Sequence, residues 1–94
     1  MKFLRTPQHK LLMEMLVAAR KAIGLTQEQL AQKIGEKQNF VSKYECGERR
    51  LDFLEIVVIS RPIEFDMENA VRDIEAKYGP IDNPKKRRPS RNRK

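Results

Sequence analysis

The chain has 94 residues, of which 39% are hydrophobic, and a formal net charge of +7. This is the size of one small domain with a modest core, and it leaves no room for a deep enzyme pocket. No run of residues is long and apolar enough to span a membrane, and the first residues lead into an amphipathic segment rather than a signal peptide. The absence of a signal peptide predicts a cytoplasmic protein. A single cysteine excludes an internal disulfide. Because the chain also has only one histidine, we expect neither a metal site nor a cofactor.

Positive charge is distributed unevenly along the chain. Residues 85–94 carry seven Lys or Arg and no acid, whereas residues 1–50 have a net charge of +5 and residues 51–84 a net charge of −5. A basic half and a basic tail indicate a polyanionic partner. A tail that only aids solubility explains residues 85–94 equally well.

The first predicted helix begins after Thr6, an N-cap followed by Pro7 at the first helical position, and Gly24 ends it. Apolar residues recur along it at spacings of three, four and seven, which predicts one inward stripe. The stripe consists of Leu11, Leu12, Met15, Leu16, Ala19, Ala22 and Ile23.

Two shorter helices follow, separated by a turn. Thr26 and Gln29 have the spacing of a capping box and start the second helix, and Gly35 turns the chain. The third helix is predicted over residues 38–46, with Gly47 as a left-handed C-cap. The inward residues of this pair are predicted to be Leu30, Ala31, Ile34, Val41 and Tyr44.

Two further helices complete the predicted domain. Asp52 caps a fourth helix through about Ser60, where Pro62 breaks it, and Asp66 caps a fifth over residues 67–78. The apolar residues are Phe53, Ile56, Val57 and Ile59 in the fourth helix, and Met67, Val71, Ile74 and Tyr78 in the fifth.

The fold class predicted from these elements is all-α, since no strand-like alternation or internal repeat occurs. Residues 1–80 form a five-helix domain. Residues 81–94, with two prolines and seven cations, form a disordered basic tail.

Residues 26–47 have the layout of a helix-turn-helix DNA-binding unit, in which the second helix enters the major groove. That second helix carries Gln38, Asn39 and Lys43, which are polar side chains where base-reading groups are needed. An amide can donate to and accept from the N6/N7 edge of adenine, and an ammonium can donate to O6/N7 of guanine.

Over about residues 8–60 the chain resembles the lambdoid phage repressor and Cro type of helix-turn-helix protein, also called the xenobiotic-response-element family. The resemblance is carried by Leu25-Thr26-Gln27, Leu30-Ala31, Ile34-Gly35, Val41-Ser42, Tyr44-Glu45 and Gly47-Glu48-Arg49. It implies a compact lambda-repressor-like bundle, of bacterial or phage origin, that binds double-stranded DNA, usually as a homodimer on a palindromic operator. Ala31 is small where the two helices cross, and Gly35 supplies a positive φ at the turn.

The resemblance also assigns roles to single residues of the third helix. Gln38, Asn39 and Lys43 face base edges, with Phe40 and Ser42 alongside. Phe40 either packs on a thymine methyl or is a partly buried staple beneath the turn, and the sequence does not distinguish the two.

Four residues are expected at the DNA backbone. Gln27 resembles the family residue that donates to a phosphate from the start of the second helix. Lys37, Arg49 and Arg50 flank the same surface as phosphate contacts, with an ordinary solvated charge as the alternative for each.

Arg20 and Glu45 match family positions that form a partly buried ion pair, which ties the recognition helix to the bundle. Cys46 is interpreted as an inert small residue rather than a redox sensor, and His9 as a surface residue. No catalytic set is recognisable, so we do not expect an enzyme.

Three functions fit these features. The first is a sequence-specific transcriptional regulator that acts as a repressor. The second is the antitoxin of a toxin–antitoxin pair that autoregulates its operon and binds the toxin protein through residues 61–84 or the tail. The third is an interaction module that has lost DNA binding, against which the polar triplet argues. The apolar stripe of residues 67–78 either forms the dimer surface or closes the core of the monomer.

Overall fold

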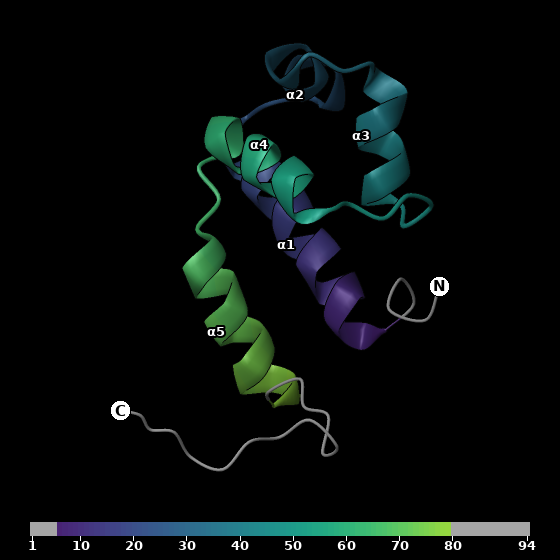
Figure 1. Ribbon diagram of the computed structural model, residues 1–94. Helices are drawn as coiled ribbons and strands as arrows, with labels where there is room; N and C mark the ends of the chain where they lie inside the picture. The colour runs from purple at the N-terminus through teal and green to yellow at the C-terminus, as the bar shows by residue number, and fades with distance from the viewer. Residues whose placement is uncertain (1–5, 80–94) are drawn as a thin grey trace.

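Five helices follow one another in a computed structural model that describes residues 6–79 (Figure 1). They are α1 (Pro7–Ile23), α2 (Gln27–Ile34), α3 (Gln38–Glu45), α4 (Phe53–Ile63) and α5 (Met67–Tyr78). The described residues contain no strand, which confirms the all-α prediction. The predicted basic tail, residues 81–94, lies outside the described residues.

Side-chain caps set the helix starts where the sequence predicts them. Thr6 Oγ1 accepts a hydrogen bond from the His9 amide (3.1 Å) at the start of α1. Thr26 and Gln29 form both bonds of a capping box at α2 (2.9 and 3.0 Å). Gly35 ends α2 with φ 75°, a left-handed conformation that side chains with a Cβ disfavour, so the turn to α3 depends on this glycine.

The predicted end of the fourth helix is wrong. Pro62 does not break the helix: α4 continues through it to Ile63, and Glu64 ends it with φ 54°. Pro62 lies in the last turn, where its missing N–H costs one hydrogen bond, to the carbonyl of Val58. One more turn buries Ile63, which is 1% exposed, and burying such a side chain contributes roughly 1.5 to 3 kcal/mol.

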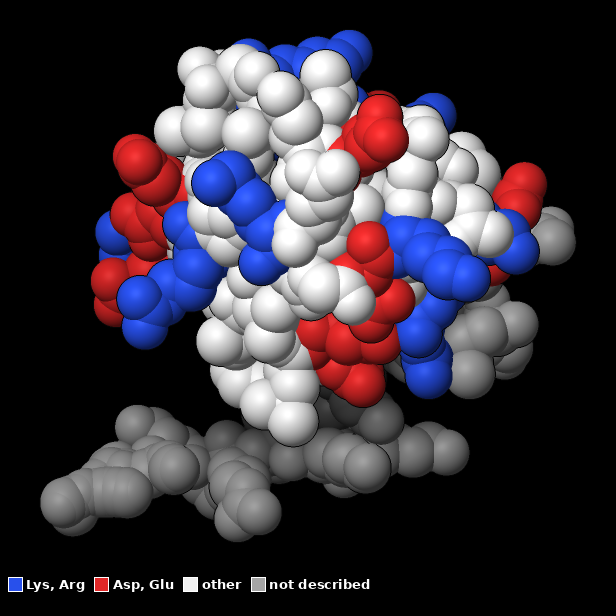
Figure 2. All heavy atoms as spheres, turned by 90° about the horizontal axis from the view of Figure 1, so that it is seen from above, with Lys and Arg blue, Asp and Glu red and all other residues white. Residues whose placement is uncertain are grey.

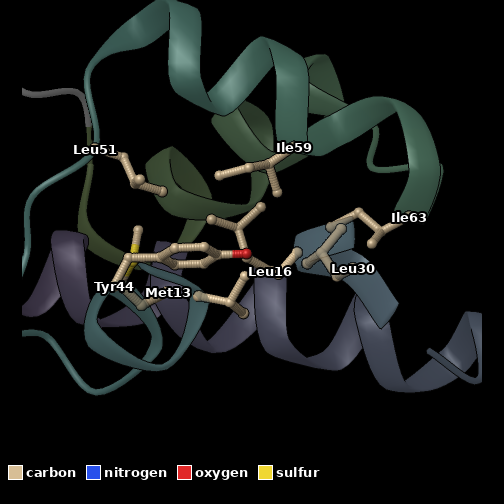
Figure 3. Packing of buried hydrophobic residues seen from close by; sticks show 9 residues of the cluster. Met13, Leu16, Leu30, Tyr44, Leu51, Ile59 and Ile63 are labelled. Atoms are coloured by element: carbon tan, nitrogen blue, oxygen red, sulfur yellow. The ribbon is translucent and has the colours of Figure 1, made fainter. Parts of the chain in front are cut away.

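The core lies where α1 crosses the other helices. α1 contacts α3, α4 and α5, and α2 contacts α3 and α4. The buried residues come from α1 to α4 and the loop before α4, and Figure 3 shows most of them around the ring of Tyr44. The cluster consists of Met13, Leu16, Leu30, Ala31, Val41, Tyr44, Leu51, Ile59 and Ile63.

The inward stripe predicted for α1 is only partly correct. Met13, Leu16 and Arg20 are the buried residues of this helix, whereas Ala22 and Ile23 are exposed. The true stripe has spacings of three and four, but it ends in a charged residue. A search for apolar periodicity therefore could not follow it to the end of the helix.

The apolar residues of α4 and α5 are also divided differently from the prediction. In α4, Ile59 is buried, but Phe53 and Val57 are exposed. In α5, which packs against α1, Ala70 is the buried residue and Val71 is 54% exposed. Of the other predicted α5 stripe residues, Met67 and Ile74 are half-buried and Tyr78 is exposed.

Candidate nucleic-acid interface

The outward side of α3 carries the three side chains expected to read bases. Gln38, Asn39 and Lys43 are exposed, while Val41 and Tyr44 on the opposite side are fully buried. The helix is therefore anchored by its apolar side and presents two amides and one ammonium group to solvent. Ser42 lies beside them and is half-buried.

Hydrogen bonds between side chains connect this outward side to the interior. The Gln38 amide donates to Gln27 Oε1 (3.3 Å), and the Gln27 amide donates to Glu45 Oε1 (2.8 Å). Gln27, expected at a phosphate, is half-buried and lies between the two helices of the unit. Sequence reasoning missed both bonds, because a residue in each pair is 11 or 18 positions from its partner.

Glu45 lies at the inner end of this chain of bonds and is paired with Arg20. Arg20 Nε lies 2.7 Å from Glu45 Oε2, and Nη2 donates to Oε1 (3.1 Å). The side chains are 9% and 7% exposed, and Arg20 Nη1 donates to the Leu25 carbonyl (2.7 Å). The bidentate geometry and the bond to Leu25 offset part of the desolvation cost of the two charges. Removal of either partner would leave the other charge buried and unpaired.

Phe40 lies on the α4 side of α3 rather than toward the polar face. It is half-buried, packs against the core cluster, and makes an edge contact with the Tyr44 ring (centroids 5.7 Å apart). The Arg49 guanidinium lies 4.6 Å from its ring centroid. The ring is therefore half-buried against the core and beside Arg49, and its contact with a thymine methyl stays a prediction.

The three cations expected at the DNA backbone differ in their surroundings. Arg49 forms two hydrogen bonds with Glu55 (3.0 and 2.9 Å), which raise the pKa of Arg49 and lower the pKa of Glu55. Lys37 and Arg50 are exposed, and within residues 6–79 neither side chain has a bonded partner. Lys37 also precedes α3 without a side-chain cap, unlike the residue before each of the other four helices described.

Arg49 therefore holds the loop after α3 against the start of α4, and its contact with phosphate stays a prediction. Glu55, the partner of Arg49, is a residue that the sequence could have revealed. It stands three residues after the cap Asp52, at the spacing of a second capping box.

Charges of both signs are visible across the face that is seen from above, where blue and red side chains are interspersed (Figure 2). The basic excess of residues 1–50 does not form a uniform positive surface in this view.

The described residues offer little for other chemistry. They contain no group of three or more potential metal ligands among His, Cys, Asp and Glu. Cys46 is exposed, and its thiol donates to the Lys43 carbonyl (3.4 Å). No helix within residues 6–79 combines the length and apolar character that crossing a membrane requires.

Comparison with known proteins gives one family. The sequence profile of a family described as Helix-turn-helix matches residues 16–68. A solved structure described as an XRE-family like protein from Pseudomonas syringae pv. tomato str. DC3000 is 38% identical and superposes with a TM-score of 0.73. The match covers 82% of this chain and 94% of that chain. No curated protein matches the chain.

Proposed function

Because the chain belongs to the XRE-like helix-turn-helix family of DNA-binding transcription regulators, we propose that it is a sequence-specific repressor that binds a palindromic operator as a homodimer. In this proposal α3 lies in the major groove, and Gln38, Asn39 and Lys43 contact base edges.

The exposed polar side of α3 is the observation that carries the proposal. Gln38 and Asn39 suit the N6/N7 edge of adenine, and Lys43 suits O6/N7 of guanine. Since the Gln38 side chain is bonded to Gln27 before any DNA arrives, less rotamer entropy is lost on binding. Each well-formed bidentate base contact contributes roughly 1 to 3 kcal/mol of discrimination.

Phosphate contacts would set the position of α3 in the groove. Lys37 directly precedes α3, and Arg50 lies five residues after its last residue. Both side chains are exposed and unpaired within residues 6–79. The Gln27 amide donates one hydrogen to Glu45 and has a second available for a phosphate oxygen. Contacts of this kind fix register, whereas the α3 side chains select the sequence.

Repression follows from occupancy alone. A bound dimer excludes polymerase from an overlapping promoter, whereas activation needs an additional contact with polymerase. Two recognition helices about one helical turn apart also read enough base pairs for useful specificity, which a single α3 does not.

Selection of bound DNA from a random pool tests the proposal. We expect a two-fold symmetric consensus, with half-site centres separated by roughly 10 base pairs or a multiple of that distance. Affinity should fall steeply with salt for every sequence, while the preference for the consensus persists. A pool without enrichment contradicts the proposal, and a stoichiometric protein that co-purifies would favour the antitoxin alternative.

A further inference from the structure

The strongest feature outside the α3 face is an apolar surface on α4, the α4 face, formed by Phe53, Leu54, Val57 and Val58. Their exposed fractions are 67%, 72%, 38% and 50%. Spacings of one, three, four and five residues place all four side chains on one side of a helix. Of the seven large hydrophobic residues exposed within residues 6–79, four lie in this one turn and a half.

Within residues 6–79, the monomer leaves this face exposed. The opposite side of α4 enters the core through Ile59 and Ile63, which are both 1% exposed. A helix that is apolar on two sides is normally covered on both, and contiguous apolar patches on soluble proteins mark interaction sites. α4 lies at the front of Figure 1 and so toward the lower edge of Figure 2, where an uncharged area borders a group of acidic side chains.

We propose that the α4 face is the surface through which two copies of this chain pair, with the two α4 helices antiparallel about a two-fold axis near Val57. The inference deepens the proposed function, because it assigns the dimer surface that a palindromic operator requires. It also replaces α5 as the candidate surface, since α5 already packs Ala70 against the bundle and leaves Met67 and Ile74 half-buried.

The α4 face continues into a groove, which enlarges the surface that a second copy can cover. The four side chains expose roughly 400 Å² per copy, about half of the ~800 Å² that each partner contributes to a stable interface. A groove of about 260 Å³ continues from Leu54 and Val58 toward the α2–α3 turn and is lined by Ile34 and Phe40 as well.

Charge at the two ends of the face favours the antiparallel orientation. Asp52 caps the start of α4, and Arg61 is exposed in its last turn, with no ion-pair partner within residues 6–79. With the axis near Val57, Arg61 of each copy lies beside the partner's Asp52 and the partner's Phe53. Both contacts are favourable for a guanidinium group, and a parallel pair would instead place like charges together.

Sedimentation equilibrium of the full chain without DNA tests the surface directly. The wild type should dimerise at micromolar to submillimolar concentrations, and Leu54→Gln should raise the dissociation constant at least about tenfold, which corresponds to about 1.4 kcal/mol. Leu54 is 72% exposed, so the variant should keep the thermal unfolding curve of the wild-type monomer. Val71→Gln, an exposed apolar residue of α5, is the matched control and should dimerise like the wild type.

Cross-linking locates the axis independently of these affinities. In a Cys46→Ser background, Val57→Cys should form a disulfide-linked dimer on mild oxidation, while Val71→Cys should not. A wild type that stays monomeric, or a Leu54→Gln variant that dimerises as tightly as the wild type, overturns the inference. If either of these results is found and DNA selection still gives a symmetric operator, the proposed function stands and only the α4 dimer is wrong. If the α4 dimer forms but no DNA sequence is selected, the proposed function is wrong and the α4 dimer stands.

Discussion

The outward sides of α3 and α4 differ in chemical character, because one is polar and the other apolar. Both helices bury apolar residues in the same core, through Tyr44 in α3 and Ile59 in α4. Outward, however, α3 presents Gln38, Asn39 and Lys43, whereas α4 presents the α4 face. Directional hydrogen-bonding groups suit the edges of bases, and an apolar surface suits another protein.

The two helices are also held in place differently. α4 is fixed by its capping box, the Arg49–Glu55 pair and its apolar side. Side-chain hydrogen bonds from α3 lead through Gln27 to the buried pair of Arg20 and Glu45. The position of the polar face therefore depends on a buried ion pair, whereas the α4 face depends on packing, a cap and a partly exposed ion pair.

The largest expected effect comes from breaking the buried pair beneath α3. Glu45→Gln leaves the Arg20 guanidinium buried without a counter-charge and should lower the free energy of unfolding by about 3 to 5 kcal/mol. Urea denaturation at neutral pH measures the loss. Glu48→Gln, an exposed acid in the following loop, is the control and should unfold like the wild type. If Glu45→Gln and Glu48→Gln unfold at the same urea concentration, the buried pair does not anchor α3.

A smaller effect, confined to DNA binding, is expected from the outward side of α3. Gln38→Ala should weaken binding to the selected operator by about 1 to 3 kcal/mol and leave binding to scrambled DNA nearly unchanged, because a base contact is lost and phosphate contacts remain. Fluorescence anisotropy on both duplexes measures this. The control is Gln32→Ala, an exposed glutamine of α2. An equal loss on both duplexes would place Gln38 at the backbone instead.

The inward side of α3 contains a hydroxyl whose removal should not destabilise the protein. Tyr44 is fully buried (Figure 3), and its hydroxyl has no hydrogen-bond partner among residues 6–79. Burial raises the pKa of this hydroxyl. Tyr44→Phe removes an unsatisfied buried group and should raise the free energy of unfolding by about 1 kcal/mol, or leave it unchanged. Thermal melting measures the change. A clear loss of stability would mean that the hydroxyl contributes a favourable interaction.

The smallest expected effect concerns the exposed pair at the start of α4. The hydrogen bonds from Arg49 lower the pKa of Glu55 below its ordinary value of 4.5. A depressed folded-state pKa stabilises the fold above the unfolded-state pKa, and this stabilisation is lost as the pH falls through the folded-state value. Wild type should therefore be slightly more stable than Glu55→Gln at neutral pH, and the gap should close below pH 4.5. Because both side chains are partly exposed, salt should also narrow the gap. If the difference in unfolding free energy persists in acid, it does not come from the ionised Glu55 paired with Arg49.

Much of the fold could be predicted from the sequence because its signals are local. Thr6, Thr26, Asp52 and Asp66 start helices through bonds to amides three residues away, and Gly35 supplies a positive φ that depends on a single residue. The order of the helices, and the exposure of Gln38, Asn39 and Lys43, follow from these ends and from helical periodicity.

Only the tertiary structure decided what depends on contacts between distant residues. The side of α4 that faces the core, the passage of that helix through Pro62, and the pairing of Arg49 with Glu55 all follow from packing against other elements. The same holds for Gln27, which the sequence places at a helix start and the fold places between Gln38 and Glu45. Periodicity indicates which residues share a side of a helix, but an apolar helix such as α4 has two suitable sides, and the choice depends on the shape of the rest of the core.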